Sequence, residues 1–122
     1  MEDPSAHNKK FQKELKSGTV ALVLLGVLEK SPEPLYGYQI AREILADGQD
    51  SDIMKQGAIY PVLRSLDKSG FLSSRVQVSE SGPPRRYYEI TAAGRAVLAE
   101  WIVIWRHNRD FIDAVLEGTV HV

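Results

Sequence analysis

Hydrophobic residues recur at helical spacing from Lys9 onward and become dense after Gly18. This pattern predicts a polar helix over Lys9–Ser17 that leads into a buried helix over Thr19–Lys30. Gly18 is expected to break or kink the helix, and the Thr19 side chain to cap its second part. Two prolines within residues 31–34 end the helix, because proline cannot continue a helix interior.

Two shorter helices are predicted next. The first covers Tyr36–Ala46, and its buried face is formed by Tyr38, Ile40, Ala41, Ile44 and Leu45. After a polar loop over residues 47–52, a further helix covers Gly57–Ser69, with Gly70 as its C-terminal stop. Pro61 is expected in the first turn of that helix or at its edge, where the amides have no acceptor within the helix.

The rest of the chain predicts a β-hairpin and a long helix. Two strands are expected over Leu72–Val78 and Arg85–Thr91, joined by a turn rich in glycine and proline. A long amphipathic helix then runs from Ala92 to about Gly118, with Thr91 as its N-cap. Three small helices followed by a hairpin are the outline of a winged helix-turn-helix. The expected fold class is therefore mainly α with a small β-hairpin, plus a long C-terminal helix.

Length and composition limit what the chain can be. Its 122 residues fit one domain, divided into a flexible tail (1–8), a winged helix-turn-helix (9–91), a dimerisation helix (92–118) and a short tail (119–122). The absence of cysteine excludes disulfides, thiolate metal sites and thiol catalysis. The apolar run Val20–Leu28 is too short to cross a membrane, and no secretion leader opens the chain, so a cytoplasmic protein is expected.

Charge is close to balanced overall but uneven along the chain. The 15 Lys and Arg against 16 Asp and Glu give a net charge of −1. Residues 29–52 are acidic, whereas residues 53–86 hold two acids against six basic residues: Lys55, Arg64, Lys68, Arg75, Arg85 and Arg86. The basic third coincides with the third helix and the hairpin, which favours a local contact with nucleic acid.

Four segments carry a family resemblance. Residues 57–66 with Gly70-Phe71-Leu72, residues 82–91 with Gly94, residues 35–40 and residues 24–28 resemble, in the right order, motifs of the PadR family of transcriptional regulators. The resemblance covers roughly residues 18–105 and implies the short subfamily, whose single C-terminal helix dimerises. One departure is Ala58, where many members carry threonine; alanine lacks the hydroxyl that could cap the helix or contact a phosphate.

A helix-turn-helix places its second helix in the major groove. Gln56 and Arg64 are candidates to read adenine and guanine, with Ser65 on the same helix. Lys55, Tyr60 and Lys68 are candidates for phosphate contacts, and the resemblance adds Tyr36. Arg85 and Arg86, held out by the stiff turn, suit a backbone or the minor groove; only one of them is expected to face DNA, since strand side chains alternate. The alternative is a solvated charged face.

The last helix indicates a dimer. Its apolar seam follows coiled-coil spacing and consists of Leu98, Trp101, Trp105, Asn108, Ile112 and Val115, with Asn108 able to fix the register. Trp101 and Trp105 can be plain packing residues. The resemblance implies that some members bind planar aromatic compounds between such tryptophans at the dimer interface.

The leading hypothesis is a homodimeric DNA-binding regulator, acting as a repressor on a pseudo-palindromic operator and released by a small aromatic effector. A winged-helix module that binds protein and not DNA is the alternative; it gains if Arg64, Lys68, Arg85 and Arg86 do not share a face. No catalytic motif is present, so an enzyme is not expected. The three histidines have no metal-site spacing, and no cofactor is expected.

Overall fold

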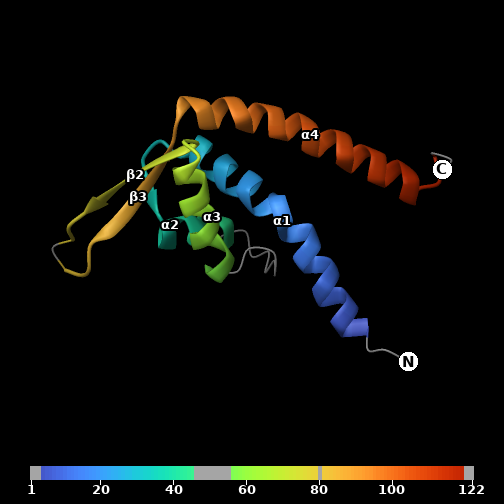
Figure 1. The fold of residues 1–122 in the computed structure, drawn as a ribbon, viewed down its shortest axis with the longest axis horizontal. Helices are drawn as coiled ribbons and strands as arrows, with labels where there is room; N and C mark the ends of the chain where they lie inside the picture. The colour runs from blue at the N-terminus through green and yellow to red at the C-terminus, as the bar shows by residue number, and fades with distance from the viewer. Residues whose placement is uncertain (1–3, 46–55, 80, 120–122) are drawn as a thin grey trace.

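The computed structural model describes residues 4–45, 56–79 and 81–119 (Figure 1). Its elements are α1 (Pro4–Lys30), β1 (Leu35–Tyr36), α2 (Gly37–Leu45), α3 (Gln56–Lys68), β2 (Leu72–Gln77), β3 (Arg85–Ile90) and α4 (Ala92–Leu116). The expected fold class is confirmed: the chain is mainly helical, with a small antiparallel sheet and a long C-terminal helix. The predicted loop over residues 47–52 lies outside the described residues.

The sheet has three strands in the order β1-β3-β2, one more than the hairpin alone provides. Ser74 pairs with Tyr88 in the hairpin, and Tyr36 pairs with Tyr87 on the other edge of β3. Tyr36 was expected to begin a helix, and this expectation is wrong, because it lies in β1 and α2 starts at Gly37. A two-residue strand is too short to show the alternation by which strands are recognised in a sequence.

The first helix begins at Pro4 and not at Lys9, so residues 4–8 are helical and do not form a tail. The expected kink is confirmed, with non-helical torsions at Ser17 (ψ 113°) and Gly18 (φ 92°, ψ −35°). The role of Thr19 differs from the prediction. Its hydroxyl donates to the carbonyl oxygens of Leu15 at 2.9 Å and Lys16 at 3.2 Å, so it binds the end of the first segment.

The turn after α3 fixes the start of the hairpin. Gly70 adopts φ 84°, and the Gly70 and Phe71 amides donate to the carbonyls of Asp67 and Leu66, both at 3.0 Å, which is a Schellman stop. The predicted stop at Gly70 is therefore confirmed. Pro61 is the sixth residue of α3 and not in the first turn, because the helix already starts at Gln56.

The turn also anchors α4. The Thr91 hydroxyl donates to the Gly70 carbonyl at 2.7 Å and accepts from the Gly94 amide at 3.0 Å, which confirms the predicted N-cap. Gly94 packs so closely on this turn that an added Cβ would lie 2.1 Å from the Phe71 carbonyl oxygen. The last helix is thus held at a fixed angle to α3 and the sheet.

One core joins all the elements. Its buried residues come from the second half of α1, from α2, α3, both hairpin strands and the start of α4; the largest of the fully buried side chains are Leu24, Leu25, Ile40, Ile59, Leu63 and Leu72. Tyr38 was expected on the buried face of α2, but 54% of it is exposed. The far ends of α1 and α4 extend away from the core and diverge (Figure 1). Within the described segments, no helix is long and apolar enough to span a membrane.

Candidate nucleic-acid interface

Helix α3 divides into a buried and an exposed face. Ile59, Leu63 and Leu66 are buried in the core. The predicted DNA-contact residues on the other face are exposed: Tyr60, Arg64, Ser65 and Lys68. Two further candidates cannot be placed in this way, because Lys55 and the Gln56 side chain lie outside the described residues. The helix therefore offers a polar, partly basic face that the core does not use.

Arg86 is tied to α3 through β2. Its Nη1 donates to the Ser74 hydroxyl at 3.0 Å, and that hydroxyl donates to a carboxylate oxygen of Asp67 on α3. Asp67 and Ser74 were missed by the sequence analysis. Their separation by seven residues across a helix end and a strand start gave no local signal. Ser74 and Asp67 hold the Arg86 guanidinium on the α3 side of the hairpin.

Charged groups of α3 and β3 act on the buried side chain of Tyr88. Burial raises the pKa of its side chain, while the positive charges of Arg86 and Arg64 oppose the rise. Asp67 and Tyr60 also act on this group. Arg64 and Asp67 of α3 and Arg86 of β3 are thus all near enough to act electrostatically on Tyr88.

Arg85 makes a different set of contacts. Its guanidinium carbon lies 4.5 Å from the centre of the Tyr36 ring, a cation–π distance. Tyr36 packs edge-on against Tyr87 at 5.3 Å and stacks with Tyr38 at 6.4 Å. Arg42 lies 6.0 Å from the Tyr38 ring centre, so a row of two aromatic rings with an arginine at each end connects the hairpin to α2.

The expectation for β3 can now be compared with the structure. Arg85 and Arg86 contact different neighbours, as strand alternation predicts, but both remain exposed. Of the two tyrosines on this strand, Tyr88 is buried and Tyr87 is half-buried. Arg42 was missed; its position one helical turn after Tyr38 was the available signal.

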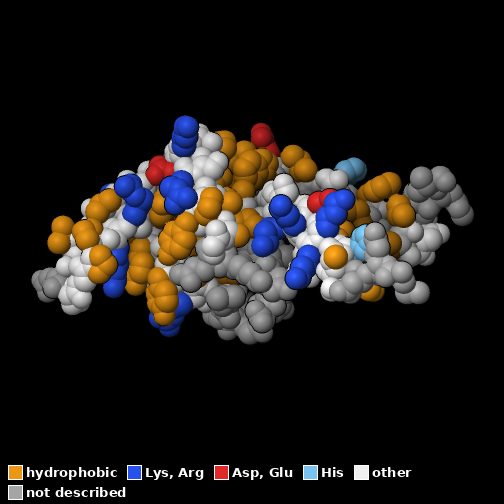
Figure 2. Space-filling model, turned by 60° about the horizontal axis from the view of Figure 1, so that its bottom comes forward, with side chains coloured by type: hydrophobic (Ala, Val, Ile, Leu, Met, Phe, Trp, Pro, Cys, Tyr) orange, Lys and Arg blue, Asp and Glu red, His pale blue; other side chains and the backbone are white. Residues whose placement is uncertain are grey.

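Basic side chains gather on one side of the molecule. In Figure 2, Lys and Arg form two groups, one at the hairpin end and one towards the middle, with few acidic side chains between them. Arg86 is tied through Ser74 to Asp67 of α3, the helix that carries Arg64, whereas Arg85 lies over Tyr36.

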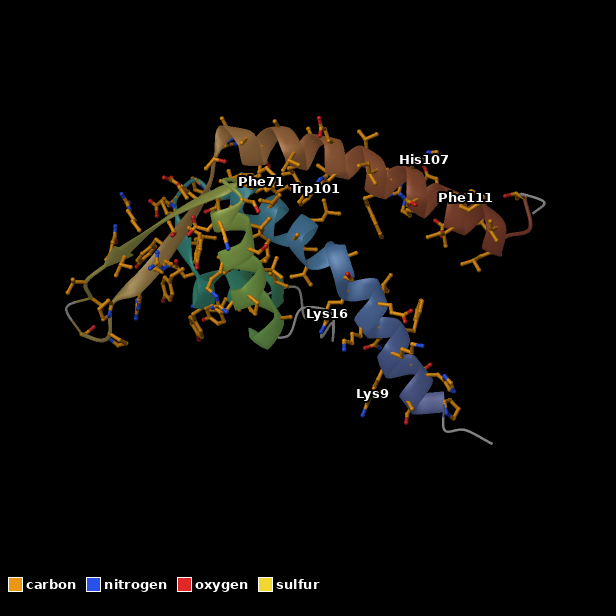
Figure 3. All side chains as sticks on the ribbon, viewed as in Figure 1. Lys9, Lys16, Phe71, Trp101, His107 and Phe111 are labelled. Atoms are coloured by element: carbon orange, nitrogen blue, oxygen red, sulfur yellow. The ribbon has the colours of Figure 1, made fainter. Side chains whose placement is uncertain are left out.

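The predicted apolar seam on α4 is buried at its start and exposed farther along the helix. Leu98 is 5% exposed and packs in the chain's own core, so its assignment to an intermolecular seam is wrong. Trp101 is half-buried, with its ring edge-on to Phe71 at 6.0 Å (Figure 3). Farther along the helix the apolar side chains are exposed; they are Val103, Ile104, Trp105, Phe111, Ile112, Val115 and Leu116. Asn108 donates from Nδ2 to the Ile104 carbonyl at 2.8 Å.

A cavity of about 400 Å³ lies between the kink of α1 and the middle of α4. Its walls are largely apolar and include Leu22, Trp101, Ile104 and Trp105, with Thr19 and Asn108 as polar members. The cavity therefore brings together the two tryptophans that were singled out as effector candidates. Among the described residues, no group of three or more histidines and acids is placed to hold a metal ion.

Comparison with known proteins gives the family. A model described as the transcriptional regulator PadR-like family matches residues 24–100. A protein of Lysinibacillus sphaericus, named "Uncharacterized protein X", is 32% identical over 98 residues, which cover 80% of this chain and 87% of that protein.

Solved structures of PadR regulators also resemble this chain. A PadR family transcriptional regulator from Eggerthella lenta superposes with a TM-score of 0.74 at 31% identity, covering 93% of this chain and 95% of that one. Bacillus subtilis PadR in complex with operator DNA gives a TM-score of 0.60 at 27% identity, covering 70% of this chain but 47% of that one. The resemblance drawn from the sequence is thus confirmed, and with it the expectation of a regulator and not an enzyme. The chain belongs to the PadR-like family of transcriptional regulators, which control transcription by binding DNA.

Proposed function

We propose that the protein is a homodimeric transcriptional repressor that reads a two-fold symmetric operator in the cytoplasm. The observation that carries the proposal is that Arg86 of the hairpin is tied through Ser74 to Asp67 of α3, the helix whose exposed face presents Tyr60, Arg64, Ser65 and Lys68. In this arrangement Arg64 reads a base edge in the major groove, and Tyr60 binds a phosphate at the helix start. Arg85 and Arg86 bind the sugar–phosphate backbone of the DNA next to that base.

Exposed apolar surface supports the homodimer. On α4, Ile104 is 56% and Phe111 54% exposed, and on α1 Phe11 is 63% exposed. A single chain has no element of its own left to cover these side chains within the described residues. A second copy of the chain would bury them and place two α3 helices on one DNA duplex.

The cavity beside the α1 kink supports a ligand-controlled switch. Its volume of about 400 Å³ suits a small planar aromatic compound, which would lie against Trp101 and Trp105. Because the second half of α1 packs on α3, a ligand wedged between α1 and α4 would alter the distance between the two reading helices. Operator affinity would then fall.

The first experiment selects DNA from the organism's fragmented genome with the purified protein and sequences what is bound. The expected result is a shared motif with two-fold symmetry, lost when Arg64→Ala protein is used. A bound set without a common motif would contradict sequence-specific regulation and favour the protein-interaction module.

A second experiment tests the effector. The chain has two tryptophans and both line the cavity, so its intrinsic tryptophan fluorescence reports on that site alone. Aromatic compounds that quench this fluorescence should also weaken operator binding. Quenching with unchanged operator affinity would show that the cavity is not coupled to DNA.

A further inference from the structure

The first half of α1 has a basic face that the proposed function does not use. Lys9, Lys13 and Lys16 are spaced four and three residues apart, which places them on one side of the helix. Phe11 and Leu15, 63% and 41% exposed, lie on the opposite side of the helix. This segment is thus amphipathic, with lysines on one side and apolar side chains on the other.

The lysine face is short of counter-charge. Residues 4–17 contain four lysines and a single acid, Glu14. Glu14 lies 4.0 Å from Lys10, which is on a different side of the helix from the other three lysines. Within the described segments, no carboxylate forms an ion pair with Lys9, Lys13 or Lys16. Such a cluster favours a polyanionic partner.

The same face borders the reading helix. Lys13 and Lys16 line a hollow of about 320 Å³ whose far wall is formed by Ala58 and Val62 of α3. Lys9 and Lys16 project from the side of α1 that faces α3 (Figure 3). The kink at Gly18 sets this direction, because the two halves of α1 are not collinear. The lysines therefore flank the start of α3.

The hairpin and this segment lie on opposite sides of α3 (Figure 1). Figure 2 shows basic side chains in both regions on one face of the molecule. A duplex that meets α3 and the hairpin would continue past the start of α3 toward the α1 segment. Its phosphates would then reach the three lysines, while Phe11 and Leu15 face away from the DNA.

We propose that Lys9, Lys13 and Lys16 bind the DNA sugar–phosphate backbone on the side of α3 away from the hairpin. The inference rests on the proposed function, because it extends the same DNA surface. Contacts of this kind carry no base information. They would add affinity for operator and unrelated DNA alike, and they would lengthen the stretch of backbone that each subunit covers.

The test compares the triple variant Lys9→Gln, Lys13→Gln, Lys16→Gln with the wild-type chain by fluorescence anisotropy across a salt series. Glutamine preserves helix propensity and removes the charge. The logarithmic salt slope should fall by about 0.9 for each phosphate that the variant no longer neutralises, which is about 2.7 for the three lysines of one subunit and about 5.4 for the dimer. The preference for operator over scrambled DNA should stay unchanged.

A matched control removes three charges elsewhere: Lys10→Gln, Lys30→Gln and Arg95→Gln. These residues are exposed and lie off the lysine face. The control should keep the wild-type salt slope. If the test variant has the same affinity and slope as this control, the inference is overturned while the proposed function stands. If the wild-type chain binds no DNA, both are overturned.

A second measurement uses the unaltered protein and does not depend on how a variant folds. Lysines are acetylated with and without DNA, and each site is quantified by mass spectrometry. DNA should protect Lys9, Lys13 and Lys16, and leave Lys10 and Lys30 reactive. Equal reactivity of all five lysines in bound and free protein would overturn the inference.

Discussion

Tyr60 of α3 packs its ring against Gly37, the first residue of α2: a Cβ built on Gly37 would lie 2.4 Å from Tyr60 Cε1. The start of α2 and the start of the reading helix are therefore in direct contact. The contact exists because residue 37 has no side chain. It fixes the position of a tyrosine that we propose binds a phosphate.

Gly37→Ala should therefore displace the Tyr60 ring. Since 37% of Tyr60 is exposed, the ring can move outward, and we expect a stability loss of about 1–3 kcal/mol with the fold retained. Operator affinity should fall with it. Gly26→Ala, where an added Cβ meets nothing within 4 Å, is the control and should be neutral or stabilising. Wild-type affinity in folded Gly37→Ala protein would contradict the role of Tyr60.

Gly94→Ala should be far more damaging to stability. The added Cβ would lie 2.1 Å from the Phe71 carbonyl oxygen, a backbone atom that also accepts the Thr91 amide at 3.1 Å. Neither side can yield without moving α4 or the turn after α3, so we expect a loss of about 3 kcal/mol in the free energy of unfolding. Urea unfolding measures this loss. A Gly94→Ala protein as stable as the Gly26→Ala protein would show that α4 and the turn after α3 can move apart at little cost.

Arg64→Ala should lower operator affinity by about 1–3 kcal/mol and relax specificity at one base step, because Arg64 is proposed to read a base. Competition binding with operators changed at single positions measures both effects. Lys68→Ala, on the same helix, is the comparison and should weaken all sequences alike. Unchanged base preference in the Arg64 variant would assign its side chain to solvent.

Arg85→Ala should weaken binding to operator and scrambled DNA equally and reduce the salt slope by about 0.9 per subunit, or about 1.8 for the dimer, as expected for a phosphate contact. Its guanidinium stands over the Tyr36 ring, 4.5 Å from the ring centre, so Tyr36→Leu should give part of the same effect by releasing it. A salt series on both variants tests this prediction. If both variants show the wild-type salt slope, Arg85 does not contact a DNA phosphate.

Stability should decline at alkaline pH through Tyr88. Burial raises the pKa of its side chain above the usual value of about 10. The contribution of Tyr88 to the free energy of unfolding is therefore complete below about pH 10. It is lost as the pH rises through the folded-state pKa, because the unfolded chain ionises first. Tyr88→Phe should show a smaller decline than wild type in urea unfolding, whereas the exposed Tyr38→Phe should not. Equal declines in both variants would contradict this assignment.

Most of the fold could be predicted from the spacing of hydrophobic residues and from the residues that kink, end or cap helices. Gly18, Gly70 and Thr91 marked the kink, the stop and the cap at the right residues, because each acts through its own backbone or nearest turn. The strand at Tyr36 could not be predicted in this way. It forms only because β3, which comes much later in the chain, offers a free edge.

The candidate site was predicted less completely. Exposed basic residues on α3 and the hairpin follow from amphipathic spacing, and Arg64 and Arg86 were found in this way. The Asp67–Ser74–Arg86 chain and the ring row ending at Arg42 depend on contacts between elements, which periodicity does not encode. Leu98 was misassigned because a seam pattern does not distinguish a residue that faces its own core from one that faces a partner.

The most direct test of the central claim, that α3 and the hairpin together read DNA, is anisotropy binding to the selected operator and to scrambled DNA across a salt series. The wild-type chain should prefer the operator by at least about 10³-fold, with affinity falling steeply as salt rises. The double variant Arg64→Ala, Arg86→Ala should lose that preference. Equal binding of the wild-type chain to both DNAs, or full preference in the double variant, would contradict the account.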